Sequence, residues 1–373
     1  MLLNFYSQIL LTTFAAMNTL LQQKTNKQVA TWLFIGVIMI VIQVLIGGIT
    51  RLTESGLSIT EWKPITGALP PLNEAAWQVE FDKYRTTNQF KYVHSNFAMS
   101  DFKFIFFWEW MHRLWARLLG VVFLIGFIYF LAAKKLRRNM LWPMVLLFFL
   151  GAIQGAIGWL MVKSGLVPEK FYVGHIELTT HFIAALILLA YTLWFALQLY
   201  YAGAEKVYSK KLSVLLITFC VLFFVQLIFG GFMAGLKAAQ SAPTWPTING
   251  SMFPAELNEL QPWYKNVFQN QLTIHFIHRG LAYLLFFTGV YFCTSTSCLR
   301  HQMFRKLKNI FLALLGVQVL LGVLAVTNAT NNKLFIYFGL MHQFVAMLLL
   351  INLVYLLFFV RAKNSITTNP SIL

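Results

Sequence analysis

Residues 104–132 read FIFFWEWMHRLWARLLGVVFLIGFIYFLA and decide the fold of this chain. The stretch is longer than the roughly 20 apolar residues that cross a bilayer as a helix rising about 1.5 Å per residue. Its charged residues, Glu109, Arg113 and Arg117, all fall in its first half. The pattern therefore predicts a membrane-spanning helix with a polar cluster toward one end.

The rest of the chain has the same character. Hydrophobic residues make up 58% of it and charged residues 11%, whereas about a quarter of a soluble domain is charged. We expect eight spanning helices, at residues 29–50, 104–132, 141–162, 176–201, 212–235, 272–292, 304–326 and 334–360. The fold class predicted is an all-α polytopic membrane protein.

Lysine and arginine gather in alternate connections, which indicates the orientation of the chain. The basic stretches lie at residues 24–27, 134–138, 206–211, 300–308 and 361–363. We expect this face, with both termini, to be cytoplasmic. The first 28 residues lack the arginines of a mitochondrial transit peptide, so we interpret them as an uncleaved lead, which favours a bacterial plasma membrane. The net charge of +17 follows this membrane pattern, and we expect no nucleic-acid partner.

The three cysteines offer no further chemistry. Cys220, Cys293 and Cys298 show no CxxC spacing and no alternation with histidine. We therefore expect neither a structural disulfide nor a zinc site.

Two short patterns repeat along the spans and indicate a duplication. Each odd span carries Gln-x-x-x-Gly, and each even span carries His-x-x-x-Ala. The glutamine–glycine pairs are Gln43/Gly47, Gln154/Gly158, Gln226/Gly230 and Gln318/Gly322; the histidine–alanine pairs are His112/Ala116, His181/Ala185, His278/Ala282 and His342/Ala346. Four-residue spacing keeps each pair on one helix face.

We predict two four-helix bundles related by a pseudo-two-fold axis along the membrane normal. The first half covers residues 29–205 with a large outer loop at 51–103, and the second covers 206–360 with an outer loop at 236–271. Residues 1–28 form the cytoplasmic lead and residues 361–373 the cytoplasmic tail.

The repeated histidines are candidate haem ligands. His112 would face His181 in the first bundle, and His278 would face His342 in the second, as six-coordinate haem iron requires. A single membrane histidine is as readily explained by a hydrogen bond to a neighbouring helix, but four in one repeated frame favour iron ligation. Copper or iron without a porphyrin is the remaining alternative.

The histidines outside this frame have less definite roles. We expect His175 to point to another face of its helix. We expect His275 to lie on the face of His278 as a supporting partner. We assign His94 to a solvated or hydrogen-bonding role in the first outer loop.

The halves differ one turn before the first histidine of each. Glu109 precedes His112 by three residues, and the matching position in the second half is His275. An acid within a spanning helix is a functional candidate, here for proton handling. A salt bridge to Arg113, four residues on, is an equal alternative.

Arginines follow or flank the proposed ligands. We predict that Arg113, Arg279 and Arg51 bind haem propionates, because guanidinium pairs with carboxylate in bidentate fashion. Ordinary placement at the membrane interface is the alternative for Arg51.

Longer strings carry a resemblance to a known family. They read GGITRLTESGLSITEWKPITGALPPLNEAAWQVEFDKY at 47–84, EWMHRLWARLLG at 109–120, HIELTTHFIAAL at 175–186, GGFMAGLKA at 230–238 and HFIHRGLAYLL at 275–285. Together they resemble the haem A synthase family, in its proteobacterial and mitochondrial subgroup.

The resemblance implies an enzyme that oxidises the C8 methyl of haem O to a formyl through hydroxylated intermediates, making haem A for cytochrome oxidase. It implies that His112 and His181 bracket the substrate haem, that His278 and His342 ligate a haem b cofactor, and that Glu109 assists the chemistry.

Several partners are expected on these grounds. Haem O is too apolar to cross water, so we expect it to enter laterally from the membrane lipid or from haem O synthase. The chain has no flavin, nicotinamide or iron–sulfur motif, which implies an external electron donor. Cytochrome oxidase assembly factors and a second copy of the chain are further candidates. The competing functions are a bis-histidine b-type cytochrome acting only in electron transfer, and a transporter.

Overall fold

The computed structural model describes residues 2–63 and 66–361, which are almost entirely helical. Eight of the helices are long and apolar enough to span a membrane, which confirms the predicted fold class. They are α1 (Leu2–Leu52), α4 (Met99–Ala132), α5 (Arg138–Gly165), α6 (His175–Tyr200), α7 (Lys210–Gly235), α10 (Gln271–Ser295), α11 (Gln302–Thr327) and α12 (Asn332–Phe359).

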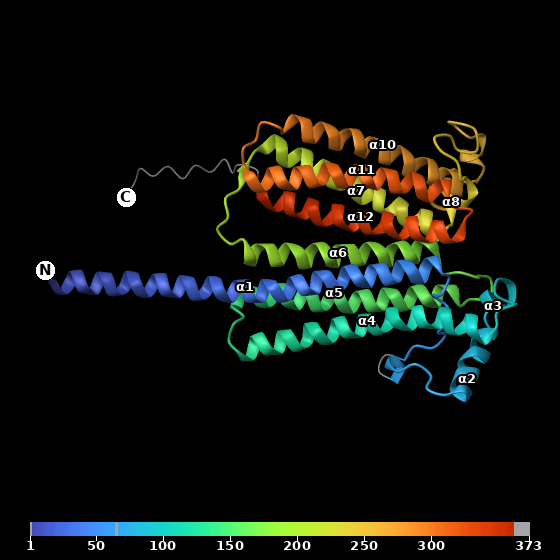
Figure 1. Ribbon diagram of the computed structural model, residues 1–373, viewed down its shortest axis with the longest axis horizontal. Helices are drawn as coiled ribbons and strands as arrows, with labels where there is room; N and C mark the ends of the chain where they lie inside the picture. Colours follow the sequence, from blue (N-terminus) through green and yellow to red (C-terminus); the bar gives the residue numbers. More distant parts are fainter. Residues whose placement is uncertain (1, 64–65, 362–373) are drawn as a thin grey trace.

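Two helices begin five residues or more before the predicted start of the span. The first 35 residues contain neither glycine nor proline, so nothing ends a helix there, and α1 runs unbroken from Leu2. Its candidate span is Leu20–Leu52, and its start extends beyond the other helices (Figure 1). The helix α4 begins at Met99 rather than at 104. The side chain of Asp101 accepts a hydrogen bond from the backbone N–H of Ala98 there at 2.9 Å, which satisfies one of the free donors of a helix start.

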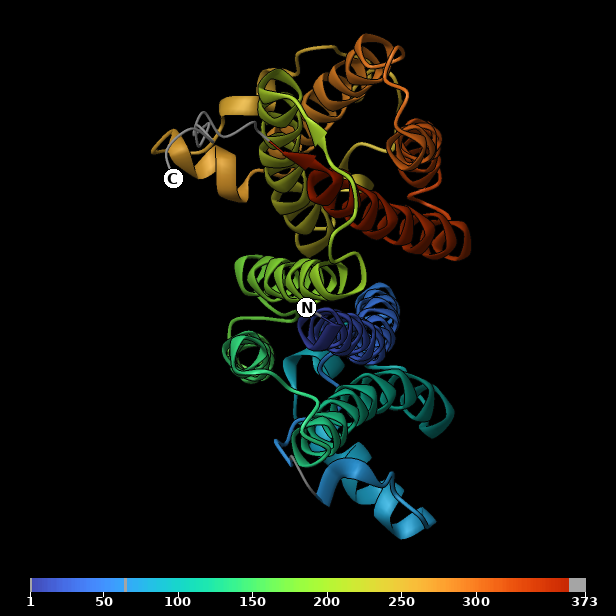
Figure 2. The same ribbon diagram turned by 90° about the vertical axis from the view of Figure 1, so that its left-hand side faces the viewer.

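The spanning helices form two groups that meet along a seam (Figures 1 and 2). Helices α1, α4, α5 and α6 make one group, and α7, α10, α11 and α12 make the other. Helix α6 packs against α1 on one side and against α7 and α12 on the other. The leucines Leu189, Leu193 and Leu197 of α6 are fully buried in this seam. The pseudo-two-fold relation between the groups stays a prediction.

The long outer loops contain short helices. Before α4 lie η1 (Thr66–Ala68), α2 (Glu74–Arg85) and α3 (Asn88–Tyr92); before α10 lie α8 (Ala238–Ser241), η2 (Ala255–Asn258) and α9 (Tyr264–Gln269). Asn73 caps the start of helix α2, because its side chain accepts from the Ala76 N–H at 2.8 Å. It buries Phe81, which stacks on Phe102 of α4 at 4.9 Å between ring centroids.

At the opposite end, two short strands tie the linker between the halves to the last helix. Strand β1 (Val207–Tyr208) pairs in parallel with β2 (Val360–Arg361). The ammonium of Lys206 lies 3.1 Å from the centroid of the Phe358 ring.

The last span also contacts the first. Gln343 of α12 donates from Nε2 to the carbonyl of Val44 on α1 at 2.9 Å. Gly48 allows this approach, because a Cβ there would lie 2.5 Å from the Gln343 Oε1. The two halves are therefore joined by polar contacts within the membrane as well as by apolar packing.

Candidate functional site

Each repeated histidine lies against the repeated glutamine of the preceding span. Gln43 Nε2 lies 3.2 Å from His112 Nδ1, and Gln154 Nε2 lies 3.2 Å from His181 Nδ1. In the second half, Gln226 Nε2 and Gln318 Nε2 lie 3.4 Å and 3.2 Å from the Nε2 atoms of their histidines, His278 and His342. The two repeated patterns thus form one recurrent contact between neighbouring helices.

The repeated glycines leave room for the histidine rings. A Cβ on Gly47 would lie 2.9 Å from Cε1 of His112, and one on Gly158 would lie 2.8 Å from that atom of His181. At Gly322 the distance would be 3.0 Å and at Gly230 it would be 3.4 Å. We call each set of glutamine, glycine and histidine a cradle, and the chain contains four.

In the second half the two cradled histidines face each other. The ring centroids of His278 and His342 are 6.5 Å apart, with an angle of 67° between the ring planes. An imidazole nitrogen binds a metal at about 2 Å, which puts two opposed ring centres about 6 Å apart. The spacing therefore fits one iron atom held between the two rings. In the first half, His181 lies within electrostatic range of His112.

The hydrogen bonds around His342 suit a ligand role. Its Nδ1 lies 3.1 Å from the backbone carbonyl of Gln318 and can donate to it. That tautomer puts a lone pair on Nε2, the nitrogen that would bind the metal; here this atom lies 3.2 Å from Nε2 of Gln318.

The side-chain amides of the cradle glutamines also contribute to the histidine sites. All four have a buried side-chain oxygen that makes no hydrogen bond within the described part of the chain. The side-chain nitrogens of Gln43 and Gln154 donate to the backbone carbonyls of His112 and His181 at 3.2 Å and 3.0 Å, which holds each amide against its histidine. The facing pair His278 and His342 therefore fits a histidine-ligated haem, and the first half repeats the same cradles.

Glu109 lies one turn from His112 on α4 and is buried. Its Oε2 accepts from the hydroxyl of Ser58 at 2.7 Å and from the N–H of Ile59 at 2.8 Å. Its Oε1 pairs with the guanidinium of Arg113 at 2.5 Å. The salt bridge considered from the sequence is therefore present, and it belongs to a larger contact between α4 and the first outer loop.

The three predicted propionate partners all hydrogen-bond to backbone carbonyls. Arg113 donates to the carbonyls of Ile59 and Glu61. Arg279 donates to the carbonyls of loop residues Ala242, Thr244, Pro246 and Thr247. Arg51 donates to the carbonyl of Ala234, across the seam. Propionate binding by these side chains stays a prediction.

The remaining histidines take distinct places. His175 begins α6, and its Nε2 lies 2.7 Å from the carbonyl of Phe268 in the second half. His275 is fully buried beside the backbone of Ala238 and close to Arg279. Glu109 and His275 therefore give the two histidine pairs different polar surroundings.

A polar cluster that the sequence analysis does not predict joins the two outer loops. Glu54, just after α1, pairs with Lys237, just after α7, and with His94 at 3.4 Å. Burial alone would raise the pKa of Glu54, but hydrogen bonds from His94 and Lys237 lower it from 4.5 to about 2. Only the position of Glu54 and Lys237 at matching helix ends could have suggested this pair.

Known proteins resemble the chain over most of its length. The profile of the COX15-CtaA family, described as cytochrome oxidase assembly protein, matches residues 30–354. A protein of Flavobacterium psychrophilum named "Heme A synthase" is 38% identical over 341 residues, which cover 90% of this chain and 98% of that protein.

Two further relatives carry the same name. The "Heme A synthase" of Azorhizobium caulinodans is 40% identical over 88% of this chain and 93% of its own length. That of Paracoccus denitrificans is 39% identical over 85% of this chain and 84% of its own length. With the four histidine cradles and the eight spans, these matches show that the chain belongs to the COX15-CtaA family of cytochrome oxidase assembly proteins.

Proposed function

We propose that the chain is a haem A synthase, which oxidises the C8 methyl of haem O to a formyl. The observation that carries this proposal is the pair of like histidine sites with unlike neighbours. Both halves have cradled histidines, but among the residues that the structure describes a buried carboxylate lies one turn from the pair in the first half only. A protein that only relays electrons needs no such difference, and the relatives named "Heme A synthase" support the enzyme.

The two halves take different roles in this proposal. His112 and His181 hold the substrate haem, and His278 and His342 hold haem b as a resident cofactor. Bound haem supplies the redox chemistry. The glutamines of the cradles orient the ligand rings, and Glu109 holds or transfers a proton next to His112. Arg113 pairs with the charge of Glu109 and keeps the carboxylate in place.

The further parts of the proposal concern delivery. Haem O enters from the lipid or from haem O synthase, an external donor supplies electrons, and assembly factors of cytochrome oxidase receive the product. The basic connections face the cytoplasm with both termini, in a bacterial plasma membrane, and a homo-oligomer is compatible with the exposed apolar helix faces.

Haem analysis of the purified protein tests the proposal. The protein is expressed with and without a source of haem O, and its haems are extracted and separated. We expect haem B in both preparations, and haem A or its hydroxylated precursor when haem O is supplied. Haem B alone under both conditions would favour the b-type cytochrome instead.

Variants of the histidines test the division of roles. His278→Ala and His342→Ala should abolish the low-spin haem b spectrum. His112→Ala should keep that spectrum and lose haem A formation. If His278→Ala or His342→Ala leaves the spectrum unchanged, haem b is not held in the second half.

A further inference from the structure

Part of the first outer loop runs back along the side of the first bundle. We call its described residues, 58–63 and 66–72, the flank segment. The flank segment is part of the connection between α1 and α2. It lies beside α4 rather than beyond the end of that helix (Figure 1). Apart from the short turn η1, it has no regular secondary structure.

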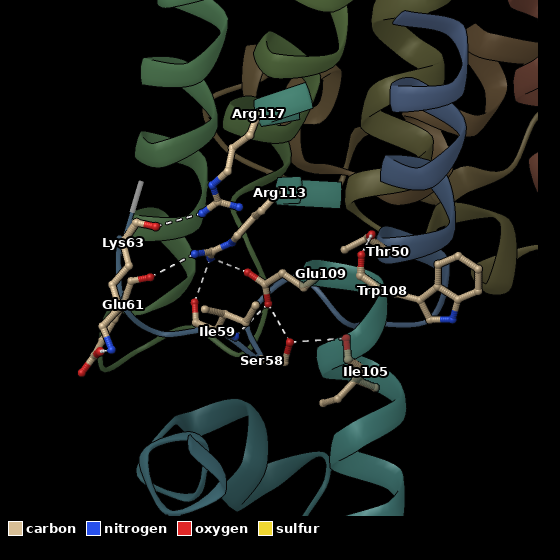
Figure 3. Close-up of polar contacts among 10 residues, drawn as sticks. All are labelled: Thr50, Ser58, Ile59, Glu61, Lys63, Ile105, Trp108, Glu109, Arg113 and Arg117. Atoms are coloured by element: carbon tan, nitrogen blue, oxygen red, sulfur yellow. Dashed lines mark hydrogen bonds and ion pairs between the residues drawn. The ribbon is translucent and has the colours of Figure 1, made fainter. Parts of the chain in front are cut away.

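Side chains of α4 bind the backbone of this segment at successive levels (Figure 3). Glu109 accepts from the N–H of Ile59 at 2.8 Å, and Arg113 donates to the carbonyl of Ile59 at 2.8 Å. Arg117, one turn further into the span, donates to the carbonyl of Lys63 at 2.8 Å. Irregular backbone is tolerated at membrane depth only where protein groups satisfy it, and α4 supplies such groups.

The length of α4 places these contacts at the edge of the hydrocarbon. About 20 residues of helix cross the apolar core of a bilayer. Ala132 is the last residue of α4, at the opposite side of the membrane, and about 20 residues counted back from it reach Arg113. The backbone held by Arg113 and Arg117 therefore lies at the boundary between headgroups and acyl chains.

A second helix gives the same depth. Trp62 of the flank segment contacts Trp159 of α5 edge to face, with ring centroids 6.4 Å apart. Trp159 lies 21 positions after Arg138, the first residue of α5, so it too falls about one hydrocarbon thickness from the opposite side. Tryptophan is enriched at this level of membrane proteins.

The segment exposes large apolar side chains. Trp62, Leu69 and Leu72 are 55%, 70% and 79% exposed, and the exposed charges of Glu61 and Lys63 pair with each other. We propose that the flank segment is an interfacial anchor that inserts Trp62, Leu69 and Leu72 into the lipid leaflet beside α4. Ser58 and Ile59 of the same segment donate hydrogen bonds to the carboxylate of Glu109. A change in the position of the segment in the lipid would therefore change the surroundings of His112.

Site-directed spin labelling in lipid bilayers tests this placement. Cys220 and Cys293 are changed to alanine and Cys298 to serine, and single cysteines are introduced by Leu69→Cys and Leu72→Cys. After nitroxide labelling, collision with oxygen, which concentrates among acyl chains, is compared with collision with a water-soluble nickel chelate. We expect oxygen to be several-fold more effective at both positions. Thr86→Cys, at the exposed end of α2, is the matched control and should show the reverse.

Two results would overturn the proposal. Preferential collision with the nickel chelate at positions 69 and 72 would place the segment in water. Protection from both reagents would mean that a protein partner or a second copy covers this face.

A second measurement does not depend on removing the cysteines. Lipids brominated near the headgroup end of the acyl chain should quench less of the total tryptophan fluorescence in Trp62→Phe than in the unaltered protein. Equal quenching in both proteins would contradict the insertion of Trp62.

Discussion

Beside each repeated histidine, the missing side chain of a glycine makes the space that the imidazole ring occupies. The fit is closest at Gly158 and Gly47 and loosest at Gly230, where a methyl group would make an ordinary contact. Glycine in a helix interior costs up to about 1 kcal/mol relative to alanine. Its use at Gly47, Gly158 and Gly322 is therefore explained by the ring and not by the helix.

Alanine at Gly322 should displace the His342 ring. A Cβ there would lie 3.0 Å from the ring, so Gly322→Ala is expected to shift the low-spin haem spectrum or its reduction potential. Gly316→Ala is the matched control, because it lies on the same helix with no atom within 4 Å of the added carbon. It should leave the spectrum unchanged. Equal spectra in both variants would show that Gly322 does not shape the ligand site.

Glu109 is the residue that distinguishes the two histidine pairs. We expect Glu109→Ala to keep the haem b spectrum and to lower haem A formation by roughly a hundredfold or more, the range of general acid–base catalysis. Ser58→Ala removes one donor to the same carboxylate and should cost less than tenfold. Haem A formation at the normal level in Glu109→Ala would reduce Glu109 to a partner of the loop.

Sequence reasoning was effective for residues that repeat. The spacing of glutamine, glycine and histidine identified the helix faces, and the structure brings those faces together. It could not identify the atoms that meet Arg279, because its acceptors are main-chain carbonyls 32 to 37 positions away. A carbonyl is present at every residue, so the side chains carry no signal for such a contact.

At the scale of elements, Arg113 and Arg279 make equivalent contacts between a helix and an outer loop. Each follows a cradle histidine and binds carbonyls of the outer loop in its own half. These bonds connect the position of the loop to that of the helix bearing the histidine.

Loss of such an arginine should free the loop. In Arg279→Ala we expect amide hydrogen exchange in residues 242–250 to become about tenfold faster or more, since each hydrogen bond from a charged donor contributes about 1.5–3 kcal/mol. Arg300→Ala, an exposed position in the connection before α11, is the control. Unchanged exchange in residues 242–250 would show that other contacts hold the loop.

Helix existence was predictable and helix starts were less so. Apolar length alone located all eight spans, because lipid leaves a chain no other way to satisfy its backbone. The start of α4 depends instead on the local contact between Asp101 and Ala98, and the extension of α1 depends on the lack of a helix-ending residue.

At the scale of the whole molecule, Glu54 and Lys237 join the outer ends of the halves. The pKa of Glu54 is lowered from 4.5 to about 2, so its contribution to stability is complete above pH 4.5 and is lost as the pH falls toward 2. His94 also faces Glu54 and belongs to the same cluster.

Thermal unfolding in detergent tests this pair. Glu54→Gln and Lys237→Met should each lower the stability at pH 7 by about 1 kcal/mol, the upper end for exposed pairs, because both side chains are partly buried. The difference between Glu54→Gln and the unaltered protein should shrink as the pH falls below 4.5. His94→Asn is measured in parallel to separate the contribution of His94 to the cluster. Melting temperatures equal to that of the unaltered protein at pH 7 would show that the pair does not hold the halves together.

The bond between Gln343 and Val44 has a consequence for biosynthesis. These residues are 299 positions apart, so a ribosome that adds about 5–20 residues per second completes the bond roughly 15 to 60 s after the first span emerges. Throughout that interval, the face of the first helix that will receive the last one is open to lipid or to other newly inserted chains. The contact between the two halves is therefore complete only after the final helix has been inserted. If translation stops before that helix, the first half lacks its neighbour at Gly48.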